Sequence, residues 1–180
     1  MNTTLFIVDT LFALLSWVFL LRLWLQLARA DYYNPISQFV VKFTQPVIAP
    51  LRRILPSLGR IDTASLALLL VVLWLKICVL ALLRGAINPW LAAWMLVPVE
   101  LLSTVLSMLF WLLLIRAILS WVSQGYNPVE RVMAQLTEPV LAPLRRIIPP
   151  IGGLDLSVMA ALFAIYLIKL LVLDIFGIQL

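Results

Sequence analysis

TQPVIAPLRRILPSLGRID, at residues 44–62, is followed 93 residues later by TEPVLAPLRRIIPPIGGLD, at residues 137–155. Both stretches keep their prolines, an arginine pair, a glycine and an aspartate in register. A match of this kind is far beyond chance, even for a chain of biased composition. The sequence therefore contains a tandem duplication, which is the first feature to look for in an unfamiliar chain. We place the two repeats at residues 1–93 and 94–180.

The spacing also holds for single residues on both sides of this stretch. The motif positions that the repeats share are Asn34, Pro46, Pro50, Pro56, Gly59 and Asp62 in the first copy and Asn127, Pro139, Pro143, Pro149, Gly152 and Asp155 in the second. Charged residues in the apolar parts of the repeats also recur, Lys76 as Lys169 at the same spacing and Arg22 as Arg116 at a spacing of 94. The duplication thus extends over most of the chain.

The composition indicates a lipid environment. Of the 180 residues, 64% are hydrophobic and 12% are charged, and the mean hydropathy is +1.13, whereas soluble domains are about half apolar and about a quarter charged. Four stretches reach the roughly 20 residues that a helix needs to cross a bilayer, at 4–28, 64–83, 97–122 and 156–175. The first residues lack the basic region of a cleaved signal peptide, so we expect the first stretch to be retained. The predicted fold is an all-α membrane protein with four transmembrane helices.

Two spans per repeat make the second copy begin on the same side of the membrane as the first, which predicts two parallel hairpins. Eight of the thirteen basic residues lie in the connections inside the repeats, and these are Arg29, Lys42, Arg52, Arg53, Arg60, Arg131, Arg145 and Arg146. Because basic loops stay on the cytoplasmic side, we expect cytoplasmic connections and periplasmic termini. Trp90 and Trp94, in an uncharged linker between the repeats, are typical of an interfacial anchor on the outer face.

Each basic connection carries an apolar stripe with helical spacing. The stripe comprises Ile36, Phe39, Val40 and Phe43 in the first copy and Val129, Val132, Met133 and Leu136 in the second. This pattern predicts a cytoplasmic amphipathic segment that lies in the membrane interface. The Asn-Pro steps at residues 34 and 127 should end the incoming span. Thr44 and Thr137 should then cap a second short helix, which Pro50 and Pro143 should kink or restart.

Two interpretations of the arginine pairs remain open. In the first, Arg52, Arg53, Arg145 and Arg146, together with Lys42 and Arg131, hold the connections in the cytoplasm and contact lipid phosphates. Each such charge contributes about 1 kcal/mol near an anionic surface. In the second, the arginines recognise a protein partner, because prolines at fixed distances from them impose a geometry that topology alone does not require.

Ionisable residues inside the apolar stretches also need an explanation. Arg22 and Arg116 lie near the cytoplasmic ends of their spans, so we expect them to snorkel to the surface. Lys76 and Lys169 lie deeper, at a depth comparable with that of Asp9 and Glu100. We predict ion pairs of Asp9 with Lys76 and of Glu100 with Lys169, or the same residues shared between the repeats. A structural role and a proton or ion relay are both open for these pairs.

The chain lacks the residues of common catalytic and metal sites. It contains no histidine, which removes the usual general base near neutral pH, and its single cysteine, Cys78, lies in a predicted span. Nothing in the pattern suggests a nucleophile beside its base. We therefore expect no enzymatic activity, no cofactor and no metal site.

Read in series, the Asn-Pro, Thr-Gln/Glu-Pro, Pro-Leu-Arg-Arg, Gly and Asp positions resemble the YggT family, also called YlmG, in its two-module proteobacterial form. The resemblance implies a multi-pass protein of the bacterial inner membrane. It also implies links to cell division and nucleoid distribution, to osmotic stress tolerance and, in plastids, to assembly of a cytochrome complex. The copies differ at Gln45 against Glu138 and at Arg60 against Gly153, and the second copy is the more typical module.

The expected function is that of a non-enzymatic scaffold or assembly factor. Its cytoplasmic connections would engage anionic lipid head groups and either a membrane-protein partner or a second copy of the chain. We expect no direct binding of nucleic acid. The alternative is a small transport or ion-homeostasis component, with the lysines and carboxylates in its pathway.

Overall fold

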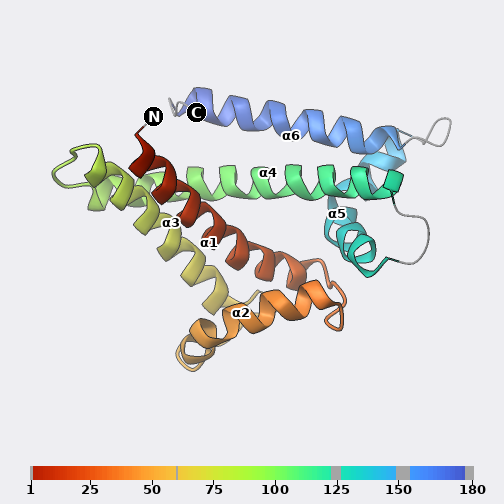
Figure 1. Cartoon of the computed structure of the whole chain (residues 1–180), viewed down its shortest axis with the longest axis horizontal. Coiled ribbons are helices and arrows are strands. Elements are labelled where there is room, and N and C mark those ends of the chain that lie inside the picture. Colours follow the sequence, from red (N-terminus) through yellow and green to blue (C-terminus); the bar gives the residue numbers. More distant parts are fainter. Residues whose placement is uncertain (1, 60, 123–126, 149–154, 177–180) are drawn as a thin grey trace. The chain divides into compact units, whose positions relative to one another are not determined.

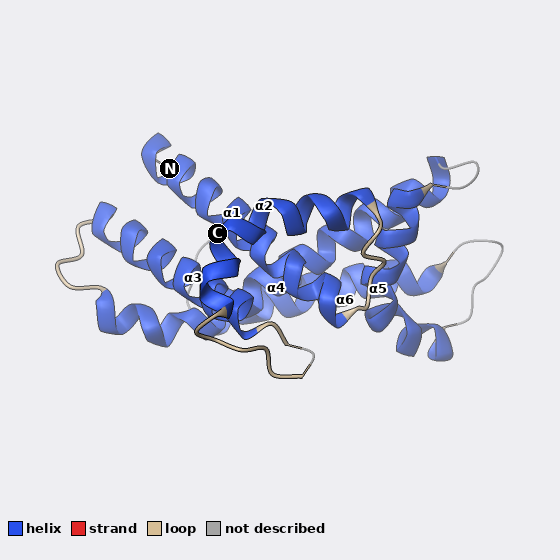
Figure 2. Ribbon diagram, turned by 90° about the horizontal axis from the view of Figure 1, so that it is seen from below, coloured by secondary structure: helices blue, strands red, loops and turns tan. Residues whose placement is uncertain are grey.

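The computed structural model describes residues 2–59, 61–122, 127–148 and 155–176. These parts of the chain form the six helices labelled in Figure 1, and Figure 2 shows them joined by loops. The helices are α1 (Thr3–Leu27), α2 (Pro35–Arg52), α3 (Thr63–Leu83), α4 (Trp90–Val122), α5 (Pro128–Ile147) and α6 (Leu156–Ile175). The all-α class predicted from the sequence is therefore confirmed.

Three of the helices are long and apolar enough to cross a membrane. They comprise α1, α3 and residues Trp90–Ser120 of α4. The fourth predicted span corresponds to α6, whose apolar run, Leu156–Val172, is shorter. Long helices of this composition satisfy their own backbone hydrogen bonds in lipid, so they are what a membrane protein requires.

Helix α4 begins earlier than the sequence predicted. The expected span started at residue 97, whereas the helix starts at Trp90 and runs through Pro98. Proline removes one helical hydrogen bond, but Trp74 of α3 supports this turn from the side. Its ring stacks on Trp94 at 5.5 Å between centroids, and its Nε1 donates to the Trp90 carbonyl at 3.1 Å.

Helices α2 and α5 each form one continuous helix, so the predicted division into two short helices is wrong. Both begin at the Asn-Pro step as expected, with the Asn34 side chain accepting from the Ile36 amide and the Asn127 side chain accepting from the Val129 amide. Thr44 lies in mid-helix, and its hydroxyl donates to the Val40 carbonyl at 2.6 Å instead of capping a new helix.

The predicted apolar stripe is used differently in the two helices. In α5 it faces protein, because Val132 and Leu136 are fully buried and Met133 is nearly so. In α2 the buried face is formed by Ser37, Val40, Thr44 and Ile48, whereas Phe39 and Phe43 are exposed. The stripe is therefore helical, as predicted, but much of it is packed inside the protein.

A tight turn connects α2 to α3. Leu58 and Ile61 pair through two backbone hydrogen bonds of 3.1 and 3.0 Å. Gly59 within this turn has a φ of 59°, a left-handed conformation that costs residues with a Cβ about 1–2 kcal/mol. The turn brings Asp62 to the N-cap position of α3. This explains why a glycine precedes the aspartate in the motif.

The chain forms two compact units. The first comprises residues Met1–Leu23 and Val40–Val105, and the second comprises Trp24–Phe39 and Leu106–Leu180. The segment from the end of α1 to the start of α2 therefore belongs to the unit that contains α5 and α6.

Candidate functional site: a polar cluster present in both repeats

Arg22, in the apolar helix α1, binds α2 in the first unit. Its guanidinium donates to the Val41 carbonyl at 3.2 Å, to the Thr44 hydroxyl at 2.5 Å and to the Gln45 side chain at 3.0 Å. Only 6% of the Arg22 side chain is exposed. The expectation that Arg22 snorkels to the surface is therefore wrong, because the side chain ends on protein acceptors.

Asp62 is the second part of this cluster. Its side chain is fully buried and lies 2.5 Å from the guanidinium of Arg52, at the end of α2. Its carboxylate also accepts from the Ser65 hydroxyl at 2.6 Å and lies 3.7 Å from Arg22. A buried carboxylate is tolerated only when it is paired and hydrogen-bonded, and Asp62 meets both conditions. It thereby joins α1, α2 and α3.

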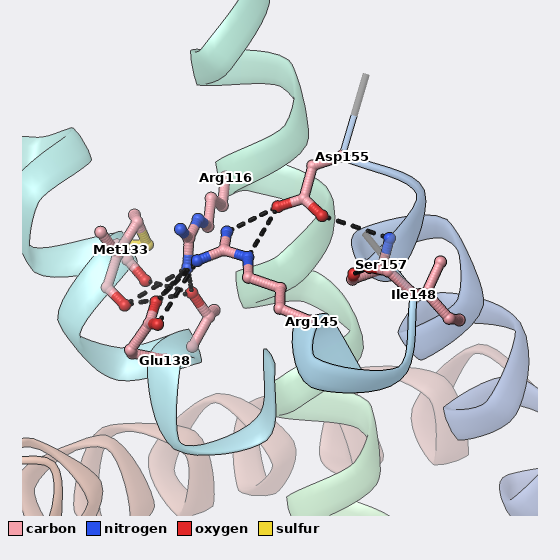
Figure 3. A network of polar contacts seen from close by, with 9 residues as sticks. Arg116, Met133, Glu138, Arg145, Ile148, Asp155 and Ser157 are labelled. Atoms are coloured by element: carbon pink, nitrogen blue, oxygen red, sulfur yellow. Dashed lines mark hydrogen bonds and ion pairs between the residues drawn. The ribbon is translucent and has the colours of Figure 1, made fainter. Parts of the chain in front are cut away.

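The second unit contains the equivalent cluster (Figure 3). Arg116 of α4 donates to the Ala134 carbonyl and to the Thr137 hydroxyl of α5, at 3.4 and 2.5 Å. Arg145, at the end of α5, donates to Asp155 at 2.5 and 3.0 Å. The bonds of Arg116 thus match those of Arg22, and the Arg145–Asp155 pair matches the Arg52–Asp62 pair. Arg116, like Arg22, does not snorkel.

The two clusters differ at one position. Gln45 accepts from Arg22 in the first unit, whereas Glu138 lies 3.6 Å from Arg116 and 3.2 Å from Arg145 in the second. Glu138 therefore adds a carboxylate between two guanidinium groups (Figure 3). The second cluster is also more open, since about a third of the Asp155 side chain is exposed.

Both aspartates have a lowered pKa. Burial by itself would raise the pKa of Asp62 above its ordinary value of 3.8, but the hydrogen bonds from Arg52 and Ser65 and the nearby charges lower it. Burial likewise opposes the lowering of the Asp155 pKa, which Arg145 and Ser157 bring about. The bond to Asp62 in turn raises the pKa of Arg52. The Arg-Asp pairs are therefore ionised at neutral pH.

The structure separates the two members of each arginine pair. Arg52 and Arg145 bind the aspartates, whereas Arg53 and Arg146 are exposed. The side chains of Arg53 and Arg146 make no hydrogen bond or ion pair with any residue in the described ranges. Lys42 and Arg131, the other predicted contact residues, are exposed as well. Arg52 is itself 43% exposed, so the two members of a pair differ in their partners: the first binds an aspartate, and the second binds none of the described side chains.

The first unit also contains a separate ionic group. Lys76 is 3.0 Å from Asp9 and 2.7 Å from Glu100. The predicted Asp9–Lys76 ion pair is present, and Glu100 shares the same lysine. In its own unit Lys169 has no carboxylate partner among the described residues. Two carboxylates around one lysine give this group a net negative charge.

Sequence reasoning identified the residues of the polar cluster but not their connections. Pro46, Pro50, Pro139 and Pro143 lie inside α2 and α5, and the Pro56 carbonyl accepts from the Thr63 hydroxyl at 2.8 Å. Pro149, Gly152, Gly153 and Arg60 lie outside the described residues.

Ser65 was missed as a partner of Asp62. One pattern in the sequence could have indicated these connections, because Arg22 recurs in the second repeat together with Thr44 and Asp62.

Within the described ranges, no group of three or more Cys, Asp or Glu side chains is arranged to hold a metal ion. The arrangement that the chain does contain is a cluster of arginine, threonine and aspartate that ties a proline-containing helix to two apolar helices. A helical membrane protein in which a duplicated motif builds this cluster twice is the class that the fold and the site define.

The chain belongs to the CCB3/YggT family, whose model matches residues 1–83 and 95–176. It is 52% identical to the "Uncharacterized protein in proC 3'region" of Vibrio alginolyticus, over 98% of this chain and 97% of the relative. It is 44% identical to the "Uncharacterized protein YggT" of Escherichia coli K12, over 97% of this chain and 92% of the relative. No solved structure is significantly similar to the chain. The family resemblance seen in the sequence is therefore confirmed.

Proposed function

We propose that this chain is a non-enzymatic scaffold of the bacterial inner membrane that presents two equivalent arginine-bearing helices to the cytoplasm. In this proposal α1, α3, α4 and α6 span the bilayer as two parallel hairpins, with both termini in the periplasm. Helices α2 and α5 lie at the cytoplasmic surface. Arg53 and Arg146 contact a membrane-protein partner and anionic head groups.

The observation that carries this proposal is that the two arginines of each pair make different contacts. Arg52 and Arg145 are held on buried or half-buried aspartates, so the adjacent Arg53 and Arg146 start from a backbone that is fixed to the apolar helices. A fixed backbone reduces the conformational entropy that a binding side chain loses. Two such arginines at equivalent repeat positions suit a partner that recognises a defined geometry. The attraction of each arginine to anionic head groups adds to this binding.

The test is crosslinking in living cells from the residues beside these arginines. Ile54 and Ile147 are equivalent in the repeats and are 77% and 76% exposed. A photoreactive residue at either position should capture the same protein. Substituting both Arg53 and Arg146 with glutamine should reduce the yield at least about tenfold, since a charged hydrogen bond contributes roughly 1.5–3 kcal/mol. Substitution with lysine should restore little of it, because lysine lacks the planar fork of arginine.

The control position is Ile87, which is 97% exposed in the connection between α3 and α4. It should not capture that protein, because the proposed topology places it in the periplasm. Adducts with lipid alone at Ile54 and Ile147 would contradict a scaffold role, and so would capture that is indifferent to the glutamine substitutions. If the lysine variant captured the protein as well as the wild type does, the positive charge of the arginines alone would account for the binding.

A second candidate function is supported by the ionic group at Lys76. A lysine with two carboxylates, Asp9 and Glu100, among apolar helices is the kind of group that proton and ion pathways use. Purified protein in liposomes would then conduct protons or cations, and Glu100→Gln would abolish the flux. Absence of flux in the wild-type protein would remove this candidate and leave the Lys76 group a structural role.

A further inference from the structure

The arginines at the ends of α2 and α5 do not use their donors equally. Arg145 binds Asp155 through Nε and Nη2, and its Nη1 donates to the two carboxylate oxygens of Glu138 at 3.3 and 3.2 Å (Figure 3). Arg52 binds Asp62 through Nε and Nη2 as well. The Nη1 group of Arg52, however, donates to no acceptor in the described part of the chain. The same donor is therefore bonded in the second repeat and open in the first.

This difference follows from the residue that replaces Glu138 in the first repeat. Gln45 is neutral, and its side-chain oxygen accepts from Arg22 at 3.0 Å. The amide nitrogen of Gln45 has no acceptor among the described residues. Arg145 thus has the carboxylates of both Asp155 and Glu138, whereas Arg52 has only that of Asp62. The second repeat supplies a carboxylate of its own where the first repeat leaves donors open.

The open donors lie on one exposed face of α2. The Arg52 side chain is 43% exposed, and Gln45 and Lys42 are exposed as well. Residues 42, 45, 49 and 52 follow one another at spacings of three or four, so they share one side of the helix. Lys42 has no carboxylate partner in the ranges that the structure describes. Its equivalent in α5 is Gln135, which accepts from the Asp31 amide at 2.9 Å.

We propose that this face of α2 binds the phosphate group of an anionic phospholipid, with Arg52, Gln45 and Lys42 as the donors. A lipid phosphodiester presents two oxygens and one negative charge, which is what the carboxylate of Glu138 supplies in the second repeat. Arginine binds carboxylate and phosphate oxygens with the same planar donor geometry. The second repeat has no equivalent site, because Glu138 already occupies the Nη1 donor of Arg145. The two repeats therefore differ in lipid binding.

The choice of a lipid over a soluble anion follows from the place of Arg52 beside a membrane span. Its partner Asp62 is the N-cap residue of α3, and α3 is long and apolar enough to cross a bilayer. The end of such a span lies at the level of the head groups, where lipid phosphates are concentrated. The site thus rests on the proposed placement of α2 at the cytoplasmic surface, but not on a protein partner at Arg53 and Arg146.

The first test exchanges the residues that distinguish the two repeats. Native mass spectrometry of the purified protein, titrated with phosphatidylglycerol in a neutral detergent, should show one tightly bound lipid for the wild type. Gln45→Glu gives the first repeat the carboxylate of the second, so it should weaken lipid binding roughly tenfold without lowering the melting temperature. Glu138→Gln opens the Nη1 donor of Arg145 and should add a second, weaker lipid site.

The control for net charge is Asn88→Asp. Asn88 is exposed in the connection between α3 and α4, and its substitution changes the net charge by the same amount as Gln45→Glu. This variant should bind the lipid as the wild type does. Equal weakening by the two substitutions would overturn the site, and so would wild-type affinity in Gln45→Glu. Absence of a second lipid in Glu138→Gln would overturn the explanation that Glu138 blocks the second repeat.

Two competing ligands identify the source of the phosphate. Phosphatidylcholine, whose phosphate is neutralised by its own head group, should bind much more weakly than phosphatidylglycerol. An excess of inorganic phosphate should leave the lipid bound. Equal retention of the two lipids would overturn an anionic ligand, and displacement by inorganic phosphate would assign the site to a soluble anion instead.

The double variant Arg53→Gln, Arg146→Gln separates this site from the scaffold proposal. It keeps Arg52, Gln45 and Lys42, so it should keep the bound lipid. Loss of the lipid in this variant would move the site to Arg53 and overturn the role of Arg52. Failure of Ile54 and Ile147 to capture any protein in cells, with lipid binding by the purified protein intact, would overturn the scaffold proposal alone.

Discussion

Asp62 is the residue on which the first polar cluster depends. Its fully buried carboxylate receives hydrogen bonds from Arg52 and Ser65 and lies near Arg22. Removing one partner of a buried ion pair leaves the other charge uncompensated, which is far more costly than never having had the pair. The chain therefore places a charge in an apolar setting only where two guanidinium groups and a hydroxyl surround it.

Substitution of the two aspartates should show how the stability lost with an ion pair depends on the burial of that pair. Asp62→Asn should lower the free energy of unfolding by about 2–4 kcal/mol, because Arg52 and Arg22 lose their shared counter-charge. Asp155→Asn should cost only about 1–2 kcal/mol, because its pair with Arg145 is partly exposed and Glu138 remains as a second acceptor. Unfolding in detergent micelles measures both. Equal losses at the two positions would contradict a burial-dependent role.

Stability should also fall in acid. The folded-state pKa of Asp62 lies below its ordinary value of 3.8, so its contribution is complete above that value and is lost as the pH falls through the lower folded-state value. Asp155 acts in the same direction. The melting temperature should therefore drop on acidification to about pH 3 and below. The double variant Asp62→Asn, Asp155→Asn should show a shallower drop, and an identical pH profile would count against the linkage.

At the scale of the element, α2 and α5 remain single helices although each contains two internal prolines. An internal proline costs a helix about 3 kcal/mol or more, so support from outside the helix is needed. In α2 the turn before Pro46 receives it from Arg22, which binds the Val41 carbonyl, and from the Thr44 hydroxyl, which binds the Val40 carbonyl. A sequence pattern predicts the proline break but not the side chains that support the preceding turn.

Arg22→Met should loosen α2 locally. Methionine keeps the apolar body of the side chain but removes the donors to Val41, Thr44 and Gln45. Amide exchange in residues 41–48 should accelerate roughly tenfold, which corresponds to about 1.4 kcal/mol of local stability. Arg116→Met is the reciprocal control and should affect α5 instead. Faster exchange in both helices from either variant would show that the clusters are not local supports.

Sequence patterns predicted the helices better than the contacts of their side chains. The apolar spans, the helix starts at Asn34 and Asn127 and the repeat all follow from local composition and spacing. The roles of Arg22 and Arg116 did not, because their acceptors lie about 20 residues away in sequence and side-chain length alone favoured snorkelling. Phe39 and Val132 share one periodicity yet differ in exposure. Their environments depend on which segment docks there, and periodicity carries no such information.

At the scale of the whole molecule, duplication makes the two polar clusters equivalent. Each cluster is formed inside its own unit, so it needs only the helices of that unit. Residues 24–39 of the first repeat instead bind α5 of the second, through the Trp24 indole on the Leu136 carbonyl and the Asp31 amide on the Gln135 side chain. The second unit therefore contains both its own polar cluster and a contact between the two repeats.

The orientation of the two repeats is the prediction that distinguishes a parallel from an inverted duplication. With Cys78, which is 1% exposed, replaced by serine, single cysteines at Ile54, Ile147 and Ile87 report one position each. Ile54 and Ile147 are equivalent residues of nearly equal exposure, so a membrane-impermeant thiol reagent should label both only after the inner membrane is permeabilised. Ile87 should react in intact cells whose outer membrane alone is opened. Labelling of Ile54 and Ile147 from opposite sides would establish an inverted repeat, and the two arginine-bearing helices would then face different compartments and could not serve one partner.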